Sequence, residues 1–154
     1  YDYVNRLMEQ NRKNSALLSA KPTETNAAAE RMAEELAGVK YRVSQLENEL
    51  FALKAKAYAG MADVLLFESA MSPDAVRRFA DAILAGCTGR IAIFAGDDEA
   101  GYKYALCQKD GDLRQTVKAL NAACNGRGGG KPFFAQGSVQ ASRAQLEAFF
   151  ASLG

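Results

Sequence analysis

The longest hydrophobic pattern in the sequence is a heptad repeat within residues 25–58. Its apolar positions are separated alternately by four and three residues, and charged residues of both signs stand beside them. A narrow apolar seam with charged shoulders is typical of a helix that pairs with another helix. The seam consists of Met32, Leu36, Val39, Val43, Leu46, Leu50 and Leu53.

The seam could pair with either of two helices. A shorter helical pattern over residues 3–19 ends at Lys21-Pro22, because proline breaks a helix, and it could fold back on the seam within one chain. Alternatively, the seam pairs with that of a second copy. We predict a homodimer, since the first helix is too short and too polar to cover the whole seam.

After Gly60, which predicts the end of the long helix, the pattern changes to short apolar runs. Residues 64–67 and 90–95 are predicted as parallel strands joined by a helix that begins at Ser72. Residues 102–107 predict a third strand, antiparallel to the second, and residues 133–135 a fourth. Helices are expected over 113–124 and after Ser142. The chain is therefore expected to be an α/β protein, with a helical or coiled-coil arm (1–60) and a compact α/β domain (61–154) that contains a mixed, mostly parallel, four-stranded sheet.

A run of glycines between the predicted helix 113–124 and the last predicted strand is the most unusual stretch. Four of the five residues 126–130 are glycine, which is costly to order, and cations flank the triple glycine. Exposed backbone N–H groups between positive charges suit a phosphate or a carboxylate. The run follows a helix, whereas in a P-loop it precedes one, so a P-loop nucleotide site is excluded. Residue chemistry alone leaves open an anion site or a glycine-rich turn beside a solvated basic face.

The local charge supports an anion site. The whole chain has a formal net charge of only +1, yet residues 112–143 contain five cations and one acid. Arg114 and Lys118 share one helix face because they are four residues apart. The predicted phosphate-binding or nucleic-acid-binding residues are Gly126, Arg127, Gly128, Gly129, Gly130, Lys131, Gly137, Arg114, Lys118 and Arg143.

Composition argues against catalysis by this chain. It contains no histidine, which removes the commonest general base and metal ligand, and its three cysteines have no metal-binding spacing. The acidic run Asp97-Asp98-Glu99 is expected to be a solvated turn. We therefore predict no catalytic residue, no metal site and no cofactor. Unpaired cysteines indicate the cytoplasm, and no apolar run is long enough for a membrane span. The N-terminal residues begin inside a helical pattern, as expected of a piece of a longer protein.

The Gly-Arg-Gly-Gly-Gly-Lys-Pro and Ala-Gln-Gly segments of 126–137 resemble the glycine-rich motif of alanyl-tRNA synthetases and of free-standing alanyl-tRNA editing proteins. That motif belongs to the DHH-associated domain, which is shared with a superfamily of phosphoesterases. The resemblance covers about residues 25–154. It implies a tRNA-binding module that holds the outer corner of the tRNA, with dimerisation through the helical part and chemistry in another domain. The zinc-dependent editing domain of that family uses histidine, so it is absent here.

The sequence departs from the phosphoesterases in one position. Their glycine run is typically followed by histidine, whereas this chain has Lys131-Pro132, and lysine cannot be the same catalytic group. The predicted function is therefore a non-catalytic module that positions alanine-specific tRNA for hydrolytic editing by another domain. The alternatives are a phosphate- or nucleotide-binding domain of a DHH-type phosphoesterase, or the C-terminal domain of alanyl-tRNA synthetase itself. Phe133 or Phe134 could stack on a base, but a buried strand position is the favoured interpretation.

Overall fold

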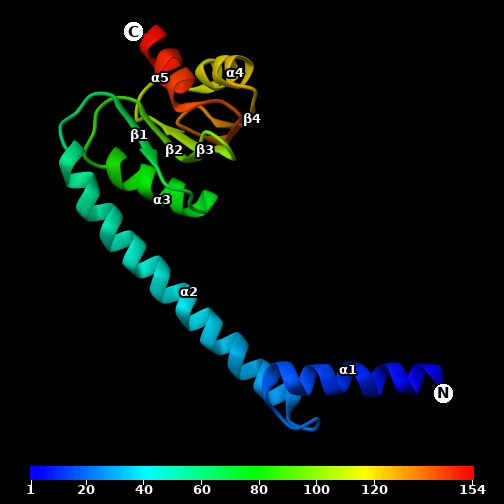
Figure 1. Ribbon diagram of the computed structural model, residues 1–154. Helices are drawn as coiled ribbons and strands as arrows, with labels where there is room; N and C mark the ends of the chain where they lie inside the picture. The colour runs from blue at the N-terminus through cyan, green and yellow to red at the C-terminus, as the bar shows by residue number, and fades with distance from the viewer. The chain divides into compact units, whose positions relative to one another are not determined.

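The computed structural model describes residues 1–154, which divide into two compact units, 1–45 and 46–154. The first unit holds helix α1 (Asp2–Leu18) and the larger part of helix α2 (Thr25–Ala55) (Figure 1). Helix α1 buries none of its residues and ends where Ser19 adopts a left-handed conformation. It leaves the seam uncovered, because Met32, Leu36, Val39 and Val43 are 47–60% exposed. The alternative in which the first helix folds back along the seam is therefore wrong.

The second unit is a five-stranded sheet with helices on both faces. Figure 1 shows α3 on one face and α4 and α5 on the other. The strand order is β1-β2-β3-β5-β4. The elements are η1 (Lys56–Tyr58), β1 (Val64–Glu68), α3 (Pro73–Leu84), β2 (Ile91–Asp97), β3 (Gly101–Cys107), α4 (Arg114–Ala123), β4 (Gly126–Lys131), β5 (Phe134–Val139) and α5 (Arg143–Ser152).

The predicted α/β class with a mixed sheet is confirmed, and two of its details are wrong. Strands β1 and β2 are parallel and joined by α3, as expected, but the other three pairings are antiparallel. The sheet is therefore mostly antiparallel. It also has five strands, because the glycine run itself is strand β4 and pairs with β5 through the turn at Pro132 and Phe133. Glycine has a low strand propensity, so the pattern gave no sign of this strand.

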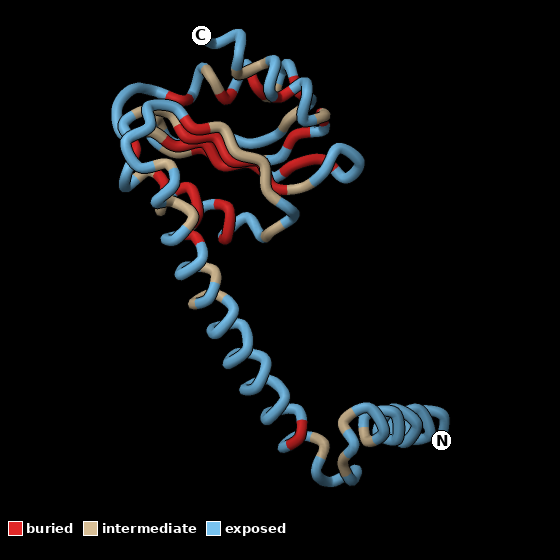
Figure 2. Tube along the Cα trace, turned by 60° about the vertical axis from the view of Figure 1, so that its left-hand side comes forward, coloured by how far each residue is buried: buried red, intermediate tan, exposed pale blue.

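The core consists of one apolar cluster on each face of the sheet (Figure 2), which follows from the alternation of side chains along the strands. On one face, Phe79 and Ile83 of α3 pack against Ile91 and Ile93. The opposite cluster places α4 and α5 against the sheet and contains Phe94, Tyr104, Leu106, Leu120 and Leu146.

The helix starts follow the sequence signals closely. Ser72 caps α3 by accepting a hydrogen bond from the backbone N–H of Ala75, and Ser142 and Gln145 form a capping box at the start of α5. Helix α4 differs, because its N-cap is Leu113 and no side chain caps it. Asp112 instead accepts a hydrogen bond from the backbone N–H of Arg114.

The last turns of α2 belong to the second unit, which begins at Leu46 rather than after Gly60. Phe51 is 4% exposed and its ring stacks on that of Phe79 at 4.8 Å. The packed face of α2 is not the heptad seam: Leu46, Leu50 and Leu53 stay 48–65% exposed. The seam is thus unburied within each unit. No helix of the chain combines the length and the apolarity needed to cross a membrane.

Candidate functional site

Strand β4 is an edge strand composed largely of glycine, and close packing of Tyr104 and of the paired backbones explains two of the glycines that meet there. Gly137 of β5 is the register partner of both Gly128 and Tyr104. A Cβ at Gly137 would lie 2.8 Å from the Tyr104 ring, and one at Gly128 would lie 2.6 Å from its hydroxyl. Tyr104 is fully buried. This glycine pair therefore makes room for a tyrosine that packs across β5 and β4.

Packing also accounts for Gly126 and Gly130 of β4, but not for Gly129, the remaining glycine of the strand. A Cβ at Gly130 would lie 2.7 Å from the Cα of Ala135, and one at Gly126 would lie 2.6 Å from the side-chain oxygen of Asn121. A Cβ at Gly129 would meet nothing within 4 Å. The fold does not need glycine at 129, so the bare backbone there is open to a ligand.

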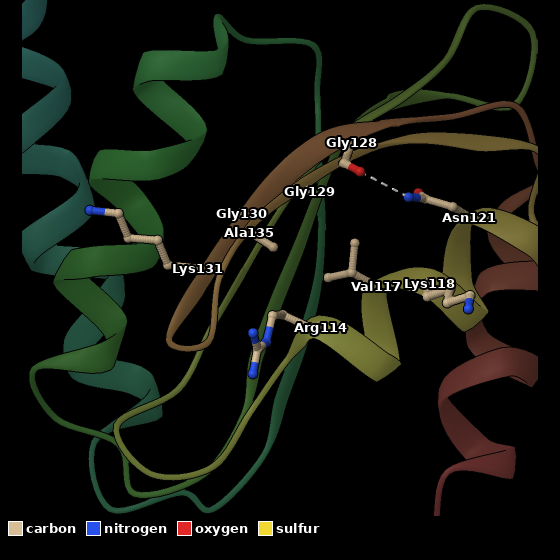
Figure 3. Close-up of a pocket in the computed structure, with 9 residues that line it drawn as sticks. All are labelled: Arg114, Val117, Lys118, Asn121, Gly128, Gly129, Gly130, Lys131 and Ala135. Atoms are coloured by element: carbon tan, nitrogen blue, oxygen red, sulfur yellow. Dashed lines mark hydrogen bonds between the residues drawn. The ribbon is translucent and has the colours of Figure 1, made fainter.

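A groove of about 310 Å³ lies between α4 and the β4–β5 hairpin. Figure 3 shows Asn121 of α4 reaching the strand, where its amide nitrogen donates a 3.1 Å hydrogen bond to the carbonyl oxygen of Gly128. Val117 and Ala135 supply apolar surface. Arg114 and Lys118 line the α4 side, so the structure brings these two predicted residues together with the glycines.

The cations around the strand differ in how far their charge is neutralised. Arg114 forms a 2.6 Å ion pair with Asp112, and the hydrogen bonds from that guanidinium lower the pKa of the Asp112 carboxyl to about 2. Lys118, Arg127 and Lys131 form no ion pair. Three cations without an ion pair thus lie on the edge strand or beside it.

These cations lie on both faces of the sheet. Arg127 and Lys131 are two residues either side of Gly129, so they share a face, and Figure 3 shows Lys131 extending away from Lys118. On that face Ser138 is the register partner of both Arg127 and Lys103, and all three residues are exposed. The sequence analysis did not include Lys103 among the candidate binding residues. The feature that could have identified it is its charge between Tyr102 and Tyr104, which are both buried.

Arg143 is not brought to the groove. It begins α5, where its guanidinium lies 4.6 Å from the ring centroid of Phe67 and pairs with Glu147 at 2.8 Å. Its backbone N–H donates a hydrogen bond to Asp98. These contacts give Arg143 a structural role in attaching α5 to the sheet.

The acidic run is a turn whose carboxylates serve the fold. Asp97 accepts hydrogen bonds from the backbone N–H groups of Glu99 and Ala100. Asp98 accepts one from the Tyr102 hydroxyl, which lowers the pKa of Asp98 and raises that of Tyr102 to about 12. No group of three or more His, Cys, Asp or Glu side chains could hold a metal ion.

The three cysteines are buried, and burial raises the pKa of Cys107 to about 12. A thiol that stays protonated is a poor nucleophile. Bare backbone beside positive charges, as at β4, is suited to an anion.

Comparison with known proteins places this fold in a family. Residues 57–153 match the family described as DHHA1 domain. The chain belongs to the DHHA1 domain family. The DHH-associated assignment made from the sequence is thereby confirmed. The match contains every residue around β4 described above, whereas the heptad seam precedes it.

The solved structures that resemble the chain include one of RecJ and one of an alanyl-tRNA synthetase domain. The structure of RecJ in complex with Mg²⁺ from Thermus thermophilus is 19% identical, with a TM-score of 0.59, and the match covers 85% of this chain and 20% of RecJ. The C-Ala domain from Aquifex aeolicus alanyl-tRNA synthetase is 14% identical, with a TM-score of 0.48, over 62% of this chain and 90% of that domain. The RecJ match indicates a shared fold. No curated protein sequence matches the chain.

Proposed function

We propose that this DHHA1 domain binds nucleic acid by holding backbone phosphates along strand β4. The observation that carries the proposal is Gly129: it is exposed, its Cβ position is empty, and uncompensated cations stand on both sides of its strand. Glycine inside a strand often marks a position where a ligand approaches the backbone closely. An edge strand also presents N–H groups that pair with no neighbouring strand.

The spacing of the cations favours a polyanion over a single phosphate. Arg127 and Lys131 are four residues apart on an extended strand, which separates their Cα atoms by about 13 Å. Lys118 lies across the strand from them, on α4. One phosphate cannot contact all three, whereas successive phosphates of a nucleic acid chain can. Contacts of this kind position a nucleic acid without reading its sequence.

The finer proposal is that the nucleic acid is tRNA, of the alanine-specific class. Its support is the Gly-Arg-Gly-Gly-Gly-Lys-Pro motif, which resembles that of the alanyl-tRNA synthetases and editing proteins. In this account the domain is not an enzyme on its own and works without a cofactor. It holds tRNA for hydrolytic editing by another domain, in the cytoplasm.

We also propose that a second copy of the chain covers the heptad seam. The seven seam residues keep a heptad spacing, and each is 47–65% exposed. The end of α2 uses a different face, around Phe51, for its contacts with the globular core. A repeated apolar seam with charged shoulders is suited to a helical partner of the same kind.

The salt dependence of binding tests the nucleic-acid proposal. Affinity of the full chain for unmodified tRNA should fall steeply with salt, and Arg127→Ala with Lys131→Ala should reduce the slope of log K against log salt by about two units. The matched control is Lys40→Ala with Lys56→Ala, which removes the same charge from α2 and η1 and should leave that slope nearly unchanged. An affinity that does not depend on salt would contradict the proposal. Stronger binding to DNA than to tRNA would instead support the alternative of a DHH-type phosphoesterase domain.

A further inference from the structure

Phe133 is the one aromatic side chain of residues 46–154 that is exposed, at 57%. It occupies the turn between β4 and β5, directly after Pro132. The next residue, Phe134, points the other way: it packs against the cluster under α3, and the Arg77 guanidinium lies 5.2 Å from its ring centroid. The turn thus separates two adjacent phenylalanines into one core residue and one that contacts solvent.

The backbone that carries Phe133 is held in place. The carbonyl oxygen of Phe133 accepts a 3.1 Å hydrogen bond from the N–H of Gln108, and that of Pro132 accepts a 2.9 Å hydrogen bond from the N–H of Leu113. Leu113 is itself buried at 1% exposure. Proline further fixes the backbone just before Phe133. A ring on such a turn binds a flat ligand with little loss of conformational freedom.

The position of this ring relative to the cations determines the class of ligand. Lys131 lies two residues before Phe133, at the end of the glycine strand. A nucleic acid whose phosphates follow β4 therefore has a base close to the turn. Aromatic side chains stack on bases of any sequence, but only where the face of the base is free. The bases of a continuous duplex already stack on one another.

We propose that Phe133 stacks on an unpaired base, so that the domain prefers loops or single-stranded segments over continuous duplex. This inference rests on the proposed function, since phosphate contacts along β4 bring the base to the turn. It adds a preference that the cations alone do not produce, because Arg127, Lys131 and Lys118 act on phosphate in either form.

The absence of tryptophan from the chain allows a direct test. Phe133→Trp makes the only tryptophan, whose fluorescence is quenched when a base stacks on it. The full-length variant is titrated at constant salt with a ten-nucleotide oligoadenylate, and with an RNA duplex that has the same number of phosphates. The control is Met61→Trp, at a position 48% exposed outside the groove. Quenching is expected for Phe133→Trp with oligoadenylate and for neither protein with duplex.

Affinity measurements complete the test. Phe133→Ala should weaken binding to oligoadenylate by about 5- to 100-fold, as loss of one base stack does, without changing the salt slope. Phe133→Tyr should bind oligoadenylate as tightly as wild type does. The affinity for duplex should be the same in wild type, Phe133→Ala and Phe133→Tyr. The stacking proposal would be overturned if Phe133→Ala weakened binding to both RNAs equally. It would also be overturned if Phe133→Ala bound as tightly as wild type and the fluorescence of Phe133→Trp did not change on binding. Salt-dependent binding would stand in either case. A wild-type chain that binds neither RNA would overturn the proposed function itself.

Discussion

Asn121 joins helix α4 to the glycine strand through a 3.1 Å hydrogen bond from its amide nitrogen to the carbonyl oxygen of Gly128. Its side-chain oxygen accepts a second hydrogen bond, also at 3.1 Å, from the hydroxyl of Tyr104. One side chain thus fixes the strand, the buried tyrosine beneath it and the helix that carries Arg114 and Lys118. The groove keeps its shape because these three parts are linked.

Removing this link should destabilise the domain. Asn121→Ala leaves the hydroxyl of the buried Tyr104 without its partner, which costs about 1–3 kcal/mol in the free energy of unfolding. Tyr104→Phe should cost about 1 kcal/mol. The double variant should lose less than the sum of the two, because both changes remove one shared hydrogen bond. Urea unfolding measures all three, and strictly additive losses would contradict the arrangement.

The glycines of β4 should differ sharply in their tolerance of a methyl group. Gly128→Ala forces a Cβ to within 2.5 Å of the Gln136 carbonyl oxygen and 2.6 Å of the Tyr104 hydroxyl, and should cost about 1–3 kcal/mol. Gly129→Ala is the matched control, because its Cβ meets nothing within 4 Å, and its effect should stay within about 0.5 kcal/mol. Thermal or urea unfolding of the two variants distinguishes them. Similar losses at both positions would show that close packing against Gln136 and Tyr104 is not the reason for Gly128.

Charges placed in the heptad seam should abolish self-association. Leu46→Lys with Leu50→Lys buries two cations in a dimer seam, so the variant should sediment as a monomer where the wild type sediments as a dimer. Tyr41→Lys with Ala52→Lys adds the same charge outside the seam and should remain dimeric. Substitution is cleaner than truncation at residue 61, which also removes Phe51 from the core. A monomeric wild-type chain would contradict the dimer.

Acid should loosen the attachment of α5. The pKa of Asp98 is lowered, first by the hydrogen bond from Tyr102 and then by that from the Arg143 backbone N–H. A lowered folded-state pKa means that the carboxylate stabilises the fold above its unfolded value, near 3.8, and that this contribution disappears as the pH falls through the lower folded-state pKa.

Asp98→Ala should therefore be less stable than wild type at neutral pH and should lose less stability on acidification below about pH 4. Asp112 titrates in the same window, with a folded-state pKa of about 2, so Asp112→Ala controls for a general acid effect. Urea unfolding at a series of pH values measures both. Parallel pH profiles for wild type and Asp98→Ala would contradict the role of Asp98.

The parts of the fold that follow local rules could be predicted from the sequence. Ser72-Pro73 and the Ser142–Gln145 box mark helix starts because the capping side chains act within four residues. Apolar runs around the crossover helix predicted the parallel pair β1–β2. These signals depend on neighbouring residues alone.

The parts that depend on distant residues could not be predicted. The glycine run forms a strand because β5 and the Tyr104 ring hold it, and both lie elsewhere in the sequence. The sequence also did not show that the cations lie on both faces of the sheet. Lys103 comes close to Arg127 only through the strand register. Arg143 was included for its charge, yet Phe67, Glu147 and Asp98 engage it. Charge counted along a sequence does not show which cations converge.

Binding of tRNA by a Gly129→Val variant tests the central claim most directly. Valine suits a strand better than glycine does, and a Cβ at this position meets no atom of the fold within 4 Å, so the urea midpoint should not fall below that of wild type. The side chain would block a phosphate from reaching the backbone, and loss of such charged hydrogen bonds should weaken tRNA binding by about 10- to 100-fold. A variant that is folded and binds tRNA as tightly as wild type would contradict the claim that phosphate is held along β4.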